Sequence, residues 1–132
     1  MQNEPSPARD VFLHDWLTYA VCRASGGKWV VSNEPSIKYR QHSNNVVGAN
    51  SGLKAKLSRF KKLKQGWYRA EILKITKVCS EISNDVVYKE LISDLSSNSF
   101  FARLNLLKYA YAGRRKLSDA FILCVLLMFG LF

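Results

Sequence analysis

The chain contains few of the residue types that mark unusual protein classes. Its 132 residues include only three cysteines, three prolines and seven glycines, and 48% of them are hydrophobic. These values exclude a disulfide miniprotein, a collagen-like repeat and a wholly disordered chain. Because Cys22, Cys79 and Cys124 are far apart and form no Cys-x-x-Cys pair, we expect reduced thiols in a cytoplasmic protein.

Long apolar runs and acidic residues are also scarce. The longest apolar run, residues 120–132, has thirteen residues, whereas a membrane-spanning helix needs about 20. Met1 is followed by polar residues, so we expect no signal peptide. Ten acidic residues against twenty basic ones give a net charge of +10. This balance predicts attraction to polyanions, which include nucleic acid, anionic membranes and phosphate-bearing substrates.

The pattern of apolar residues predicts an α+β fold that is mostly α. After a flexible leader at residues 1–10, we expect a helix from about residue 14 that stops at Gly26-Gly27. Two short edge strands, or a β-hairpin, are expected at residues 28–31 and 36–42. From about residue 50 the sequence predicts a helical tail with helices near residues 53–64, 67–82, 85–95, 99–111 and 118–132.

Residues 14–16, His-Asp-Trp, lie at the start of the first expected helix. Asp15 there could simply favour the first turn of the helix, and His14 could be structural. In a functional interpretation Asp15 is a general base, and His14 and Trp16 shape an acceptor pocket. A second cluster of hydrogen-bonding side chains, Arg40, Gln41, His42 and Asn45, follows the second expected strand. It could contact a phosphate or sugar, or it could be the polar end of a hairpin.

Together these clusters resemble the bacterial family 2 glycosyltransferases, most closely the rhamnosyltransferase type. The resemblance covers roughly residues 11–50. It rests on the order and spacing of His-Asp-Trp at 14–16, Gly-Lys at 27–28, Glu-Pro at 34–35, Tyr-Arg-Gln-His at 39–42 and Asn-Val-Val-Gly at 45–48. Residues 11–49 would then be the C-terminal piece of a GT-A catalytic domain, and residues 50–132 its helical tail.

The resemblance implies an inverting transfer of a sugar from a nucleotide-sugar to a glycan or lipid-linked acceptor. Asp15 would take the proton from the acceptor hydroxyl, since aspartates are generally ionised at neutral pH. Arg40, Gln41 and His42 would lie near the donor diphosphate, with Asn45 among the substrate-binding residues. The same resemblance implies polysaccharide biosynthesis at the cell envelope, with the protein cytoplasmic or peripheral at the inner face of the membrane.

The sequence departs from that family in one major respect. It contains no Asp-x-Asp motif and no nucleotide-binding half before Asp15. We therefore assign no metal ligands or cofactor to this chain and expect the divalent metal (Mg²⁺ or Mn²⁺) only in a complete enzyme. The chain is predicted to be a truncated C-terminal fragment that transfers no sugar alone. Exposed edge strands would also make a homodimer plausible.

The chain is strongly basic between residues 38 and 77, where Glu71 is the one acidic residue. A solvated helix face, a helix on an anionic membrane surface and a nucleic-acid site are all compatible with this charge. Nucleic acid is the least favoured, because no nucleic-acid-binding motif accompanies the charge. The alternative to a transferase fragment is therefore a stand-alone basic helical adaptor that binds anionic membrane or nucleic acid. The basic residues are Lys38, Arg40, Lys54, Lys56, Arg59, Lys61, Lys62, Lys64, Arg69, Lys74 and Lys77.

Overall fold

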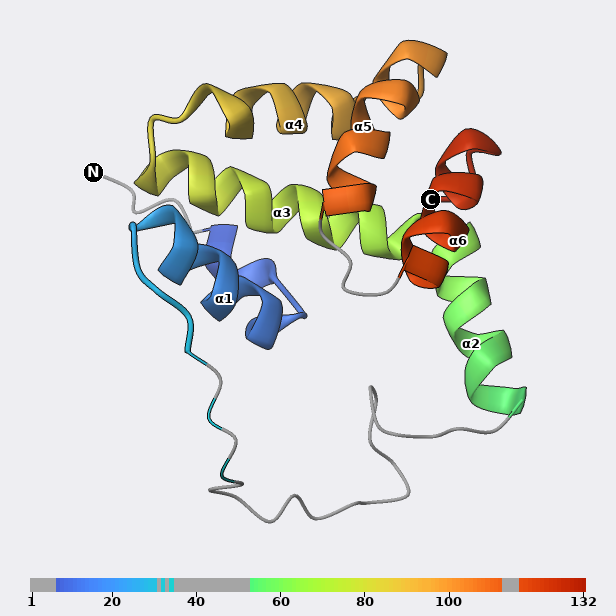
Figure 1. Ribbon diagram of the computed structural model, residues 1–132, viewed down its shortest axis with the longest axis horizontal. Helices are drawn as coiled ribbons and strands as arrows, with labels where there is room; N and C mark the ends of the chain where they lie inside the picture. Colours follow the sequence, from blue (N-terminus) through green and yellow to red (C-terminus); the bar gives the residue numbers. More distant parts are fainter. Residues whose placement is uncertain (1–6, 31, 33, 35–52, 113–116) are drawn as a thin grey trace.

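A computed structural model describes residues 7–30, 32, 34, 53–112 and 117–132 of the chain, and the side chains of residues 7 and 53–56 are outside this description. The described residues form helices only (Figure 1). In chain order these are the 3₁₀ turn η1 (Pro7–Asp10), α1 (His14–Ala24), α2 (Leu53–Lys64), α3 (Trp67–Ile82), α4 (Val86–Ser96), α5 (Phe100–Ala112) and α6 (Leu117–Met128).

Local sequence signals set most of these boundaries, and the expected helices are confirmed. Helix α1 ends in a Schellman motif, in which the Gly26 amide donates to Arg23 O and the Gly27 amide donates to Cys22 O. Gly26 has a φ of 76°, a conformation that glycine adopts without a Cβ penalty. At the start of α4 the Asp85 carboxylate accepts a hydrogen bond from the Val87 amide at 3.0 Å.

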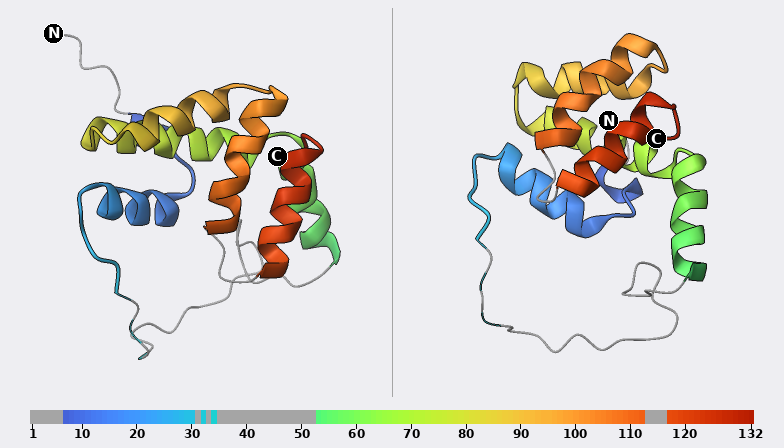
Figure 2. Two further views of the ribbon diagram at one scale, coloured as in Figure 1. Left: turned by 45° about the horizontal axis from the view of Figure 1, so that its top comes forward. Right: turned by 45° about the vertical axis from the view of Figure 1, so that its right-hand side comes forward.

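Helix α3 is the centre of the molecule. It lies between α4 and α1, and η1 and α2 also pack on it (Figure 1). Helices α5 and α6 lie side by side, and α5 packs on α4, while α2 projects from the N-terminal end of α3 (Figure 2). This arrangement places the beginning of α1, with its His-Asp-Trp sequence, directly against α3.

The apolar core is divided into two clusters along α3. The first joins the segment before α1 to α3 through Val11, Leu13, Ile75 and Cys79. The second joins α4, α5 and α6, and its buried members are Leu95, Leu106, Ala110 and Leu127. Helix α1 has no buried residue within its own span. Its attachment to the core therefore depends on the two buried residues ahead of it, Val11 and Leu13, and on partly buried side chains of its own.

The prediction of an α+β fold with edge strands is wrong, because the described residues contain no strand. Residues 28–30, expected to begin the first strand, are extended but unpaired; Val30 is 85% exposed. The Trp29 ring packs instead against Tyr19 of α1, with 5.4 Å between the ring centroids. A strand needs a partner to satisfy its backbone, and the described part of the chain offers none. The second expected strand, residues 36–42, lies outside the described residues.

Candidate functional site

The His-Asp-Trp sequence forms the first turn of α1. His14 and Asp15 are both exposed, and Trp16 is 43% exposed. The N-cap position is Leu13, which makes no side-chain cap, so Asp15 lies inside the helix rather than at its cap. Within the described part of the chain no group donates a hydrogen bond to the Asp15 carboxylate. The helix start thus presents an accessible carboxylate at a fixed position.

Glu71 on α3 holds this helix start in place. Its side chain is buried, and its Oε2 atom accepts hydrogen bonds from the amides of Phe12 (2.6 Å) and Leu13 (3.3 Å). Both amides lie just ahead of α1, where backbone N–H groups lack helical partners and the helix dipole favours a negative charge. The Glu71 carboxylate therefore does what a side-chain cap would do, from 58 and 59 residues away.

Lys74 adds two further contacts to this arrangement, and Glu71 and Lys74 with the backbone groups that they bind are called the Glu71 clamp below. Its Nζ atom lies 2.8 Å from Glu71 Oε1 and donates a second hydrogen bond to the Asp10 carbonyl at 2.9 Å. Burial alone would raise the pKa of Glu71, but the hydrogen bonds from Lys74, Phe12 and Leu13 outweigh burial and lower that pKa. Glu71 is therefore held ionised, and it ties η1 and the start of α1 to α3.

Aromatic side chains lie beside the His-Asp-Trp sequence, between α1 and α3. The Trp16 ring is stacked on Tyr68 of α3, with 6.5 Å between centroids and an interplanar angle of 28°. Trp67 packs edge-on against both Tyr68 and Phe12, and Lys62 of α2 lies 4.6 Å above the Trp67 ring. Trp16 therefore connects the exposed start of α1 to a larger aromatic surface on α3.

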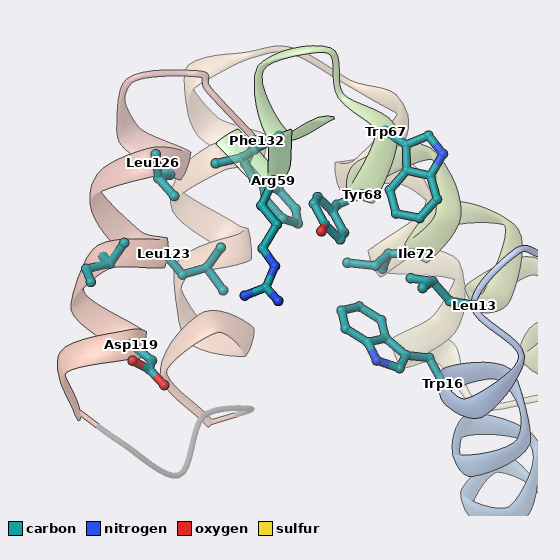
Figure 3. A pocket seen from close by; sticks show the side chains of 12 residues that line it. Leu13, Trp16, Arg59, Trp67, Tyr68, Ile72, Asp119, Leu123, Leu126 and Phe132 are labelled. Atoms are coloured by element: carbon teal, nitrogen blue, oxygen red, sulfur yellow. The ribbon is translucent and has the colours of Figure 1, made fainter. Parts of the chain in front are cut away.

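This aromatic surface is one wall of a cavity of about 470 Å³ between α1, α2, α3 and α6 (Figure 3). Arg59 of α2 and Asp119 of α6 are the charged residues that line it. The remaining wall is aliphatic or aromatic, and its residues include Leu13, Leu63, Ile72, Leu123, Leu126 and Phe132. Volumes of 300–1,000 Å³ with mostly apolar walls are typical of small-molecule sites. The expectation that Trp16 shapes an acceptor pocket stays a prediction, and the sequence gave no signal for α6 as a wall of this cavity.

The structure brings only part of the expected site together. Arg40, Gln41, His42 and Asn45 lie outside the described residues, so their expected position beside Asp15 stays a prediction. Within residues 7–30, 53–112 and 117–132, no three His, Cys, Asp or Glu side chains gather in a group that could hold a metal ion. The divalent metal expected for a complete enzyme likewise stays a prediction. None of the described helices is long and apolar enough to cross a membrane.

The basic residues of the helical tail serve different structural purposes, which sequence reasoning missed. Arg69 of α3 donates hydrogen bonds to the carbonyls of Asp94, Leu95 and Ser97 at the end of α4 and to the Phe132 backbone oxygen. It satisfies helix carbonyls that lack partners. Arg69 and Lys74, two of the eleven basic residues between residues 38 and 77, are therefore bound to other parts of the fold and do not belong to a solvent-facing charged surface.

Comparison with known proteins supports the resemblance at a coarse level. No family model matches the chain, and no solved structure matches it. Over 130 residues the chain is 31% identical to the dTDP-rhamnosyl transferase RfbG of Shigella flexneri. The match covers 98% of this chain and 43% of that relative. The chain is therefore similar to a glycosyltransferase along almost all of its own length, and it spans less than half the length of that relative.

Proposed function

We propose that the chain is the acceptor-side portion of a sugar-transferring enzyme of the inverting type, with Asp15 as its general base. The observation that carries the proposal is the exposed Asp15 carboxylate on a helix start that Glu71 and Lys74 fix from α3. A base must be both accessible and positioned, because misplacement by about 1 Å can cost on the order of 100-fold in rate. The similarity to a rhamnosyl transferase supports the reaction class.

In the proposed reaction the Asp15 carboxylate accepts the proton of an acceptor hydroxyl. The hydroxyl oxygen forms a bond to the anomeric carbon of the donor sugar, and the bond from that carbon to the nucleoside diphosphate breaks. The diphosphate leaves with the bonding electron pair. His14 and Trp16, next to Asp15, would contact the acceptor, and Arg40, Gln41, His42 and Asn45 would contact the donor.

The donor side would come from a nucleotide-binding half, together with any divalent metal, outside this chain. The name of the Shigella relative makes dTDP-rhamnose the first donor to test. The acceptor would be a glycan or a lipid-linked glycan. The isolated chain is accordingly expected to transfer no sugar, and metal-dependent turnover of a nucleotide-sugar by it alone would contradict this proposal.

A chimera of the two proteins tests the assignment of Asp15. In the Shigella relative, the matched portion is replaced by this chain, and rhamnose transfer from dTDP-rhamnose is measured with Mg²⁺ or Mn²⁺ present. Asp15→Asn should lower transfer by roughly 100- to 10,000-fold, the usual contribution of a general base. The fold should survive, because the Asp15 side chain is exposed and makes no hydrogen bond or ion pair with the described residues.

Asp10→Asn is the matched control. Asp10 is also exposed and lies five residues earlier, and its described contact is made by the backbone carbonyl rather than the carboxylate. It should transfer like the unchanged chimera. Transfer that survives Asp15→Asn would refute the base assignment. A folded chimera that binds the nucleotide but transfers nothing would refute the acceptor-side role of the chain.

A further inference from the structure

Helix α6 is apolar on every side. Each residue from Ala120 to Met128 is hydrophobic, and Asp119 is the one charged residue within the helix. Helix α5 packs on one side of it, where Leu127 joins Leu106 of α5 in the core. A helix that is hydrophobic all round is normally covered all round. The side of α6 that α5 leaves open is therefore a candidate interface.

This open side carries a row of large exposed side chains. Four of them recur at intervals of four residues, which places them along one face of the helix, and two more flank them. Phe121 is 71% exposed and Phe129 is 75% exposed. These six residues, called the α6 row below, are Leu117, Phe121, Ile122, Val125, Met128 and Phe129.

The area of the α6 row is close to what one partner contributes to a stable dimer. Its side chains together expose on the order of 600 Å² of apolar surface, at the upper limit of the largest patch on a typical monomer. A standard interface takes about 800 Å² from each partner. The row therefore supplies most of one interface without any other element.

The α6 row is also suited to cover itself. A two-fold axis brings the same patch of both copies together. With that axis near Val125, Phe121 of one copy lies against Phe129 of the other. Val125, smaller than its neighbours in the row, leaves room at the centre for the two helices to approach each other.

Charge favours this face over the basic parts of the surface. Each copy carries a net charge of +10, so two copies repel each other. Helix α6 contains no lysine or arginine, which makes the repulsion smaller there. A helix that lies on an anionic membrane instead carries basic residues beside its apolar face. The composition of α6 therefore suits a second copy better than a membrane.

The α6 row points away from the candidate functional site. At 3.6 residues per turn, it lies on the far side of α6 from Leu123 and Leu126, which line the cavity. Figure 3 shows Trp16 on the opposite side of that cavity from these two leucines. A nucleotide-binding half that meets Asp15 would approach from a different side and leave the row uncovered.

We propose that the chain forms a two-fold symmetric homodimer in which the α6 rows of two copies pack against each other. The described residues contain no edge strand of the kind from which the sequence predicted a homodimer, so this dimer uses a different surface. Sugar transfer is not required for it. Both Asp15 carboxylates stay accessible in the dimer.

Sedimentation equilibrium of the whole chain over a range of concentrations tests the proposal. A reversible monomer–dimer equilibrium is expected, with a dissociation constant of about 10 µM or tighter. Phe121→Glu should weaken the dimer on the order of 100-fold, because it places a charge inside an apolar interface. Val86→Glu introduces the same charge at an exposed apolar position on α4 and should leave the dissociation constant unchanged.

Two further measurements sharpen the test. If Phe121→Glu fails to fold, Phe129→Glu at an equally exposed position replaces it. Added salt should tighten the dimer, because it screens the repulsion between two basic copies. Under mild oxidation Val125→Cys should form a disulfide across the two-fold axis in higher yield than Val86→Cys or the unchanged chain.

Several outcomes would overturn the proposal. A chain that stays monomeric at all concentrations has no such interface, and a dimer that survives the folded glutamate variants uses another surface. Weakening by salt would indicate an interface between charged groups, and growth beyond the dimer would exclude a closed two-fold pair. Binding of a monomeric chain to anionic vesicles that Phe121→Glu abolishes would assign the row to a membrane. Because none of these measurements uses sugar transfer, failure here is distinguishable from failure of the chimera assay.

Discussion

Glu71 shows how one buried carboxylate can position a site that is distant in sequence. Burying a charge costs free energy unless it is paired and hydrogen-bonded. Here the amides of Phe12 and Leu13 and the ammonium of Lys74 meet that requirement. The consequence is that a residue with no place in the proposed chemistry controls where Asp15 lies.

Substitution of Glu71 should therefore destabilise the fold in a pH-dependent way. At pH 7 Glu71→Gln should lower the free energy of unfolding by roughly 2 to 4 kcal/mol, because charge-assisted hydrogen bonds are lost. The folded pKa of Glu71 lies below its ordinary value of about 4.5. The stabilisation is thus fully present above about pH 4.5 and is lost as the pH falls through the lowered pKa.

Urea unfolding from pH 7 down to pH 3 measures this difference. The gap between the unchanged chain and Glu71→Gln should shrink toward the acid end of the range. Glu81→Gln, an exposed position on the same helix, should stay within about 0.5 kcal/mol of the unchanged chain throughout. A difference in the free energy of unfolding that is constant with pH would mean that ionisation of Glu71 does not contribute to stability.

At the scale of helices, α3, α4 and the last residues of the chain are joined by Arg69. Its guanidinium reaches three carbonyls at the end of α4 and one at Phe132, at distances of 2.5 to 3.1 Å. A lysine has three donors on a single atom and cannot reproduce that fork. Arg69→Lys should therefore lower the free energy of unfolding, measured by thermal unfolding, by about 2 to 3 kcal/mol. Arg23→Lys, at an exposed position on α1, should cost less than about 0.5 kcal/mol, because Arg23 makes one long hydrogen bond, to the Gly27 carbonyl at 3.3 Å. Equal costs would contradict the capping role of Arg69.

The helices could be predicted from the sequence, because their signals are local. Asp85 caps α4 within two residues, and Gly26 ends α1 within its own turn. The prediction of edge strands was wrong, because a strand depends on a neighbouring strand that the periodicity of its own sequence does not reveal. The roles of Arg69 and Glu71 were also out of reach. Their backbone partners lie 25 to 63 residues away, and only the packing of α3 brings them together.

For the molecule as a whole, the division of the core predicts uneven stability. Helix α1 is attached through Val11, Leu13, the Glu71 clamp and partly buried side chains, and it buries no residue within its own span. We expect its amides to exchange with deuterium through a partial opening of lower free energy than that of α3. Native-state hydrogen exchange measured at increasing denaturant concentration tests this. A single free energy and a single denaturant slope shared by both helices would show instead that they open together.

The Glu71 clamp also limits how genes for such proteins can be recombined. A crossover between residues 30 and 53 would join α1 from one parent protein to α3 from another. The Glu71 carboxylate and the Phe12 and Leu13 amides that it holds would then come from two different parents. A crossover ahead of η1 inherits Asp10, Phe12, Leu13, Glu71 and Lys74 as one unit. The helical tail is thus no separable appendage, and shuffled libraries should be enriched in functional junctions upstream of residue 7.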